Sequence, residues 1–138
     1  LQAAGLSAQV HLGRTPEIMK SARLCLVCSG TATLETAWFG TPMVIVYRTA
    51  GWHRFVVPLF LNVKHIGLVN VVGGREVVPE FLKFDDDPEP VAEAALRLLQ
   101  DEAEYDACKR RIKDVTDTMG TPGSFGRAAE AVLQMVGR

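Results

Sequence analysis

A short polar turn in the first third of the chain has the residue types of a phosphate-binding site. Residues 24–47 read LCLVCSGTATLETAWFGTPMVIVY, in which Ser29, Gly30 and Thr31 separate an apolar run from a helical pattern. A helix that begins there presents unpaired backbone N–H groups and the positive end of its dipole. Gly30 would let an anion approach the backbone closely, and the two hydroxyl groups add donors. The turn favours a bound phosphate, although a βα turn selected only for capping is the simpler explanation of an isolated Ser-Gly-Thr.

Glu35 limits which phosphate compounds the turn could bind. It stands four residues after Thr31, so both side chains lie on one face of the expected helix. A carboxylate there would repel a phosphate but could accept hydrogen bonds from ribose or sugar hydroxyl groups. The turn lacks both the Gly-x-Gly-x-x-Gly of a dinucleotide site and the lysine of a Walker A loop. A nucleotide-sugar therefore fits these residues better than hydride transfer or ATP hydrolysis.

Two apolar segments must position this turn. Residues 24–28 and 43–47 are continuous apolar runs of five, which are typical of parallel strands covered on both faces. Residues 32–39 between them form a crossover helix that Gly40 and Pro42 end. In doubly wound sheets, ligands bind beyond the carboxyl ends of the strands, and the Ser-Gly-Thr turn follows one of those ends.

The rest of the chain continues the alternation of strands and helices. We expect a short strand at residues 9–12, a brief helix with Thr15 as its N-cap, and a third main strand within residues 66–72. Further helices are expected at residues 52–61, 91–100, 103–118 and 125–136. This order predicts an α/β fold with a Rossmann-like, doubly wound parallel sheet.

Composition limits the class of protein. The chain has 138 residues, of which 48% are hydrophobic and 22% charged, and its net charge of -1 gives no reason to expect nucleic acid as a partner. The three cysteines fit reduced thiols, because Cys25 and Cys28 lie three apart in an expected strand and point to opposite faces.

The acidic run at residues 85–87 is interpreted as the start of a helix and not as a metal site. We therefore expect no metal and no cofactor. The start at Leu1 suggests a piece of a longer protein.

Several motifs together resemble one family. The run SGTATLE is followed by Gly-Thr-Pro-Met-Val, a strand that ends in Tyr47-Arg48, Asn70, Gly74 and finally VPEFL. In this order and spacing they resemble the carboxyl-terminal part of the bacterial lipid-A-disaccharide synthase family. Val69, where proline is expected, and Arg23-Leu24, where Ala-Asp is expected, depart from that pattern. Neither departure touches the Ser-Gly-Thr turn.

The resemblance implies a function and a domain. The family consists of GT-B glycosyltransferases, built from two Rossmann-like domains, which transfer 2,3-diacylglucosamine from its UDP derivative to 2,3-diacylglucosamine 1-phosphate (lipid X). The products are the β-1,6 lipid A disaccharide and UDP. Residues 1–138 would form the UDP-sugar-binding C-terminal domain, with the final helices over about 91–138. The acceptor-binding N-terminal domain, which would supply the general base, is absent from this chain.

The resemblance also implies site residues. Ser29, Gly30 and Thr31 would face the UDP diphosphate, with Glu35 close to the ribose or the sugar. The other implied donor contacts are Tyr47, Asn70, Gly73, Gly74, Arg75, Glu76 and Glu80. Structural alternatives stay open for four kinds of position. Tyr47 could be a packing aromatic, Asn70 a turn cap on the surface, Arg75 and Glu76 a solvated pair, and Glu80 the start of a helical turn.

Membrane contact is a further expectation. Residues at helical spacing share one apolar face, namely Trp52, Phe55, Val56, Leu59 and Phe60. Flanked by Arg48 and Lys64, this face could enter an anionic membrane surface, or the segment could be a core helix. The resemblance implies a cytoplasmic protein, peripheral at the inner membrane of a Gram-negative bacterium and part of lipopolysaccharide biosynthesis. A homodimer is left open.

Two other functions remain open from the sequence. A UDP-N-acetylglucosamine 2-epimerase has a similar Ser-Gly turn, with further carboxylates just behind it where this chain has Thr36-Ala37. A non-catalytic module that only binds UDP or a UDP-sugar would need no residues beyond those named. Analysis of the reaction products distinguishes the first from a transferase, and a binding titration addresses the second.

Overall fold

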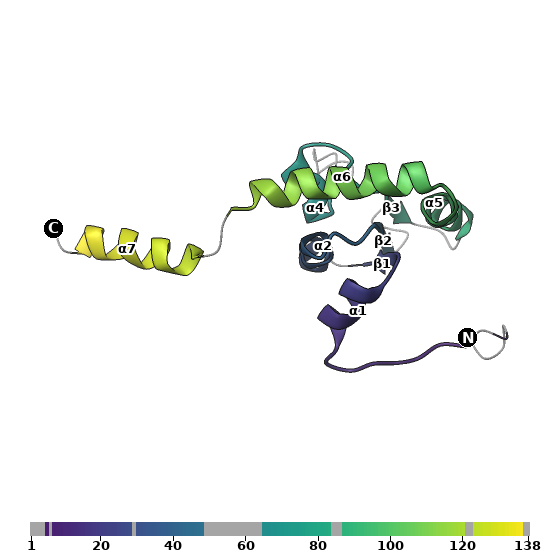
Figure 1. Cartoon of the computed structure of the whole chain (residues 1–138), viewed down its shortest axis with the longest axis horizontal. Helices are drawn as coiled ribbons and strands as arrows, with labels where there is room; N and C mark the ends of the chain where they lie inside the picture. Colours follow the sequence, from purple (N-terminus) through teal and green to yellow (C-terminus); the bar gives the residue numbers. More distant parts are fainter. Residues whose placement is uncertain are drawn as a thin grey trace.

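The computed structural model describes residues 5, 7–28, 30–48, 65–83, 87–120 and 123–136. Its helices are α1 (Thr15–Ser21), α2 (Gly30–Trp38), α4 (Leu68–Gly73), α5 (Glu89–Gln100), α6 (Glu102–Thr118) and α7 (Ser124–Val136). Its strands are β1 (Cys25–Val27), β2 (Met43–Arg48) and β3 (Glu80–Lys83), in the order β1-β2-β3 (Figure 1). All pairs are parallel, which confirms the expected Rossmann-like α/β fold.

Strand β2 forms the centre of the sheet and of the core. Cys25 pairs with Met43 on one side, and Ile45 pairs with Glu80 on the other. Met43, Val44 and Ile45 are completely buried, as a continuous apolar run predicts for a strand covered on both faces. Side chains alternate along the strand, so Ile45 and Tyr47 share one face and Val44 belongs to the other.

Helices cover both faces. Figure 1 shows the strands between α2 and α4 on one side and α5 on the other. Helices α2 and α4 also pack against each other on the face of Ile45 and Tyr47. Helix α6 lies across the amino ends of the strands, because Cys108 lies close to the backbone of Met43, the first residue of β2, and Arg111 Nε donates to the Val77 carbonyl, just before β3, at 3.0 Å. The carboxyl ends therefore lie at the opposite edge of the sheet from α6.

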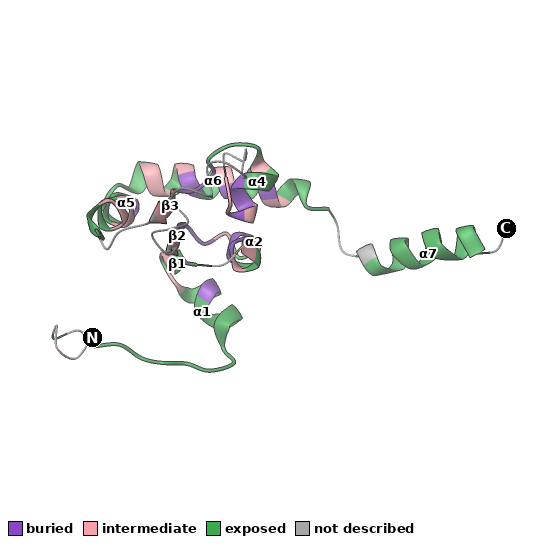
Figure 2. Cartoon of the chain, turned by 180° about the vertical axis from the view of Figure 1, so that it is seen from behind, coloured by how far each residue is buried: buried purple, intermediate pink, exposed green. Residues whose placement is uncertain are grey.

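Helix α7 stands apart from the sheet. It extends away from α6, and its described side chains are all exposed (Figures 1 and 2). Phe125 is 90% exposed and Met135 is 79% exposed. The expected helix is confirmed, but its apolar side contacts none of the described core.

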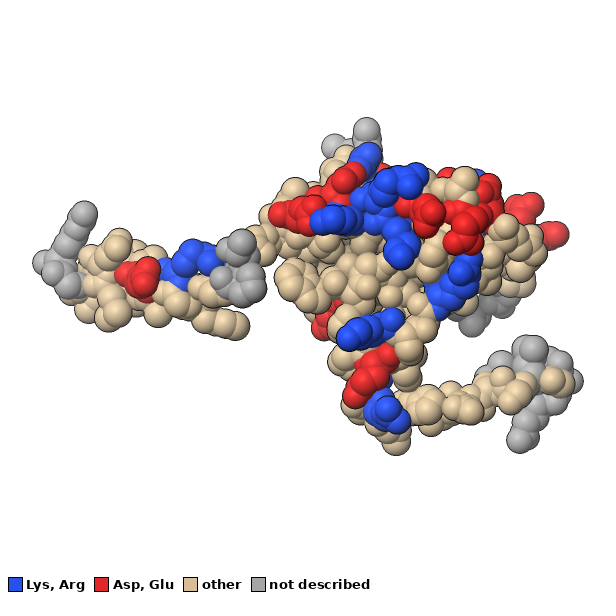
Figure 3. All heavy atoms as spheres, in the orientation of Figure 1, with Lys and Arg blue, Asp and Glu red and all other residues tan. Residues whose placement is uncertain are grey.

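Charges of both signs alternate along α6. Figure 3 shows basic side chains on this helix next to acidic ones. Arg111 pairs with Glu104, and Lys113 pairs with Asp117. This mixed surface agrees with a chain whose net charge is close to zero.

Two expected strands are wrong. Residues 66–72 contain helix α4 instead of the expected third main strand. The third strand of the sheet is β3, which is not predicted from the sequence. A short apolar run does not distinguish a strand from a helix packed on one side. Here Val69 is buried whereas Val71 and Val72 are 50% and 47% exposed, the pattern of a helix with one inner face.

The amino-terminal segment also differs. Residues 9–12 form no strand, and Val10 and Leu12 are 88% and 89% exposed. Helix α1 begins at Thr15 itself, with Arg14 as the N-cap, one residue earlier than expected. The helix expected at residues 52–61 lies outside the described residues.

Candidate functional site

The candidate phosphate turn lies at the carboxyl end of β1. Helix α2 starts at Gly30, and its first turn contains no acidic side chain. Thr31 is exposed on that turn, while Ser29 lies outside the described residues. Gly30 does not have a positive φ, so the glycine there is not required by a left-handed backbone. Its value is the space that a missing side chain leaves at the helix N-terminus.

Tyr47 brings an unused hydroxyl group to this turn. The hydroxyl is buried and has no hydrogen-bond partner within the described structure. A Cβ atom placed on Gly30 would lie 3.9 Å from it. Burial raises the pKa of Tyr47, and the charges of Glu80 and Cys28 raise it further, so the phenol keeps its proton. An unpaired buried hydroxyl costs about 1–3 kcal/mol, which an anion bound at the α2 N-terminus would recover.

Glu35 lies on another side of α2. It is exposed and lines an apolar groove of 310 Å³ together with residues of α1, α2 and the end of α6. It stands five positions after Gly30, and the helical rotation over five residues turns it well away from the face that meets Tyr47. The structure therefore does not bring the Glu35 carboxylate to the Tyr47 hydroxyl.

Asn70 is a buried residue that connects two segments, so its alternative interpretation as a turn cap on the surface is wrong. Its side chain is fully buried on α4 and makes four hydrogen bonds. Nδ2 donates to the Val78 carbonyl at 3.0 Å and to Glu80 Oε2 at 2.9 Å. Oδ1 accepts from the N–H groups of Val77 and Val78 at 2.8 and 3.1 Å. The amide joins α4 to the segment that leads into β3.

Glu80 holds the start of α4. It is the first residue of β3, not of a helical turn, so that alternative is wrong. Its side chain is only 10% exposed, and Oε1 accepts the N–H groups of Ile66 and Gly67, each at 2.8 Å. His65 Nδ1 lies 3.7 Å from Oε2. The carboxylate thus satisfies N–H groups at the amino end of α4.

The residues at the end of α4 and directly after it make contacts within the protein. A Cβ on Gly73 would press against Val77, and Gly74 ends the helix with φ 62°. Arg75 pairs with Asp114 of α6 at 3.1 Å, with both side chains mostly exposed. The alternative of a solvated Arg75–Glu76 pair gives way to a solvent-exposed pair of Arg75 with α6.

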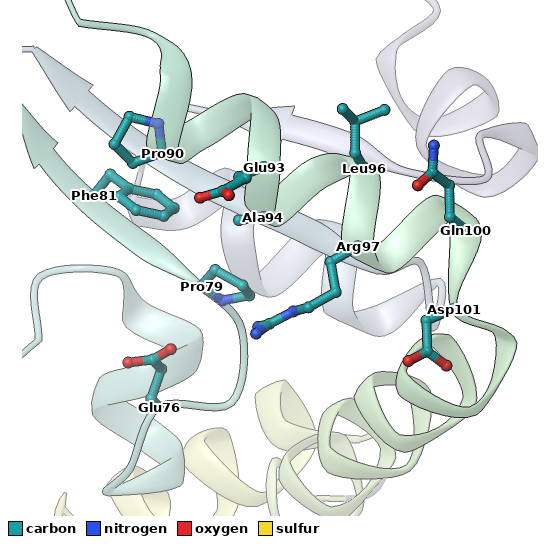
Figure 4. Close-up of a pocket in the computed structure, with 10 residues that line it drawn as sticks. All are labelled: Glu76, Pro79, Phe81, Pro90, Glu93, Ala94, Leu96, Arg97, Gln100 and Asp101. Atoms are coloured by element: carbon teal, nitrogen blue, oxygen red, sulfur yellow. The ribbon is translucent and has the colours of Figure 1, made fainter.

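A separate cavity borders Glu76. It has a volume of 790 Å³ and is lined by residues of β3, of the segment before that strand and of α5 (Figure 4). The charged groups in its lining are Arg97 and three carboxylates, those of Glu76, Glu93 and Asp101. The excess of negative charge disfavours a diphosphate, so the size of this cavity does not make it the donor site.

Two residues of the site were missed by the sequence analysis. The Thr33 hydroxyl donates to the Gly30 carbonyl and accepts the N–H of Val69 at 3.3 Å. Leu68 Cγ would lie 3.5 Å from a Cβ on Gly30. Thr33 follows Gly30 by three residues and so falls on the same helix face, which is a signal that could have identified it.

The expected acyl-contact residues Trp52, Phe55, Val56, Leu59 and Phe60 lie outside the described residues. In the described part of the chain, no helix combines the length and apolar character needed to cross a bilayer. Within the same residues, no three His, Cys, Asp or Glu side chains are arranged to hold a metal ion.

The fold is that of a Rossmann-like chain whose candidate phosphate turn follows the carboxyl end of β1, and comparison with known proteins gives the family. The family model described as lipid-A-disaccharide synthetase matches residues 2–132. The chain is 38% identical over 133 residues to the lipid-A-disaccharide synthase of Anaeromyxobacter dehalogenans, covering 95% of this chain and 35% of the relative. The Geobacter sulfurreducens synthase is 35% identical over 138 residues, covering 100% and 36%. The Persephonella marina synthase is 34% identical over 119 residues, covering 86% and 31%.

The chain therefore belongs to the lipid-A-disaccharide synthase family, which confirms the resemblance. It spans about a third of the length of the curated relatives it matches.

Proposed function

We propose that this chain is the UDP-sugar-binding domain of a lipid-A-disaccharide synthase. The complete protein would transfer 2,3-diacylglucosamine from its UDP derivative to lipid X. The 6-hydroxyl oxygen of the acceptor forms the bond to the anomeric carbon, and the bond from that carbon to UDP breaks. A base outside this chain takes the hydroxyl proton, and the configuration at the carbon inverts.

The observation that carries the proposal is the unpartnered Tyr47 hydroxyl beside Gly30. The departing UDP gains negative charge on its phosphate. The N–H groups at the start of α2 and the Tyr47 proton are placed to stabilise that charge. Neither group has to move a proton in the reaction, so both act as fixed donors.

The partners of the complete protein follow from the same proposal. Its substrates are UDP-2,3-diacylglucosamine and lipid X, and its N-terminal domain completes the cleft. Because both substrates carry acyl chains, peripheral contact with the cytoplasmic face of the inner membrane is proposed, through residues 52–60. A homodimer is compatible with this arrangement.

Calorimetry with UDP, UMP and uridine on the complete enzyme tests the assignment of Tyr47. Tyr47→Phe removes one hydrogen bond to a charged group, so UDP affinity should fall by roughly 10- to 100-fold. Uridine affinity should not change. The melting temperature should stay equal or rise, since the variant removes an unpaired buried hydroxyl.

Tyr105→Phe is the matched control, because Tyr105 lies on α6 under the Arg23 guanidinium and away from the turn. It should leave UDP affinity unchanged. Equal affinities of wild type and Tyr47→Phe for UDP would contradict the assignment. Product analysis with UDP-2,3-diacylglucosamine and lipid X separates transfer from epimerisation.

A further inference from the structure

Glu80 is a mostly buried carboxylate whose neighbours are chiefly N–H groups. Three hydrogen bonds reach it, from the backbone of Ile66 and Gly67 and from Asn70 Nδ2. A buried charge is costly unless hydrogen bonds satisfy it. Here they do, and all three come from the segment that begins α4.

The start of α4 in turn touches the first turn of α2. Leu68 packs beside Gly30, and the Val69 N–H donates to Thr33, whose hydroxyl also bonds the Gly30 carbonyl. A methyl group on Gly67 would clash with Ile45, so the backbone of α4 lies directly on β2. The contacts form a continuous path from Glu80 through α4 to the proposed phosphate turn.

We infer that Glu80 and Asn70 are positioning residues of the donor site. Their hydrogen bonds hold α4 in the place where Leu68 supports Gly30 next to the Tyr47 hydroxyl. Neither residue contacts the nucleotide. The inference rests on the proposed function, since it assumes that the first turn of α2 binds the donor diphosphate.

Glutamine cannot replace Glu80. An amide oxygen can accept from Ile66 and Gly67, but the amide nitrogen would then face Asn70 Nδ2, and two donors would oppose each other. The double variant Asn70→Asp/Glu80→Gln, called the exchanged pair below, reverses the hydrogen bond between positions 70 and 80. The amide nitrogen at position 80 then donates to a carboxylate at position 70. The exchange keeps the total charge, but it loses the donation to Val78 and places a carboxylate oxygen at position 70 against the Val78 carbonyl oxygen, so the recovery is expected to be partial.

The experiment measures UDP affinity by calorimetry on the complete enzyme, at a temperature well below the melting temperature of each variant. Glu80→Gln should weaken UDP binding about tenfold or more and raise the donor KM more than it lowers kcat. The exchanged pair should regain at least part of that affinity. Glu93→Gln makes the same chemical change at an exposed site on α5 and should have no effect.

Leu68→Ala provides a second variant, which leaves the carboxylate intact and removes the side chain that packs beside Gly30. It should also weaken UDP binding, and it decides the question if Glu80→Gln does not fold. Folded variants with a lower melting temperature but wild-type UDP affinity would overturn the inference and leave the proposed function intact. Loss of affinity in Glu80→Gln with wild-type affinity in Leu68→Ala would overturn it too, because that result indicates that position 80 acts on the donor directly and not through α4. A wild-type enzyme that does not bind UDP would refute the proposed function itself, and with it the inference.

Discussion

At the scale of single residues, the buried polar side chains fall into two groups: those that already make hydrogen bonds within the protein and those that do not. Asn70 and Glu80 use their polar atoms on neighbouring groups of the protein. The Tyr47 hydroxyl has none of its own within the described residues. A buried group without a partner is the one most able to gain from a ligand.

Asn70→Ala should therefore destabilise the protein, contrary to what a surface amide would do. It leaves the N–H groups of Val77 and Val78 unsatisfied in the core, which costs about 3 kcal/mol. Chemical denaturation of the complete enzyme measures the loss. Gln100→Ala, at an exposed amide near the end of α5, is the control and should change stability by less than about 0.5 kcal/mol. A melting temperature unchanged by Asn70→Ala would show that the buried bonds contribute nothing.

At the scale of elements, α4 connects the sheet to α2. It is a short helix of six residues that buries Val69 and Asn70. Short helices are unstable alone, so this one depends on its contacts. Glu80 satisfies its amino end and Gly74 ends it, while Gly67 allows its backbone to approach Ile45.

Gly67→Ala should be strongly destabilising, because the added methyl group collides with the Ile45 side chain in the centre of the sheet. Overpacking of this kind costs about 1–3 kcal/mol. Gly126→Ala is the control: its position on α7 is open, and alanine favours a helix by up to about 1 kcal/mol. Thermal unfolding should show a lower melting temperature for Gly67→Ala and no decrease for Gly126→Ala, and a tolerated Gly67→Ala would mean that α4 does not lie so close to β2.

At the scale of the whole molecule, the relevant comparison is between the chain and its family. The chain spans about a third of the length of its curated relatives. Its proposed site lies at one edge of a three-stranded sheet and provides donors for a diphosphate. None of the described site groups is a base placed to take a proton from an acceptor hydroxyl.

The 138-residue chain alone should therefore lack transferase activity. One side of a two-domain cleft does not hold both substrates or supply the base. The assay follows UDP release from UDP-2,3-diacylglucosamine with lipid X present, and the complete enzyme at equal concentration is the positive control. Steady turnover by the chain alone would show that the base lies within these residues.

The sequence by itself determined the α/β class, the β1-α2-β2 unit, the three carboxyl-terminal helices and the family. These depend on local patterns: apolar runs, helical periodicity, the Ser-Gly-Thr turn and the order of motifs. Tertiary structure decided that residues 66–72 contain a helix, that Asn70 is buried, and that Tyr47 meets Gly30. Each of these depends on contacts between segments far apart in the chain, such as Val69 with Thr33. Residue type shows which hydrogen bonds a side chain can make, but only packing determines which of them the protein has already used.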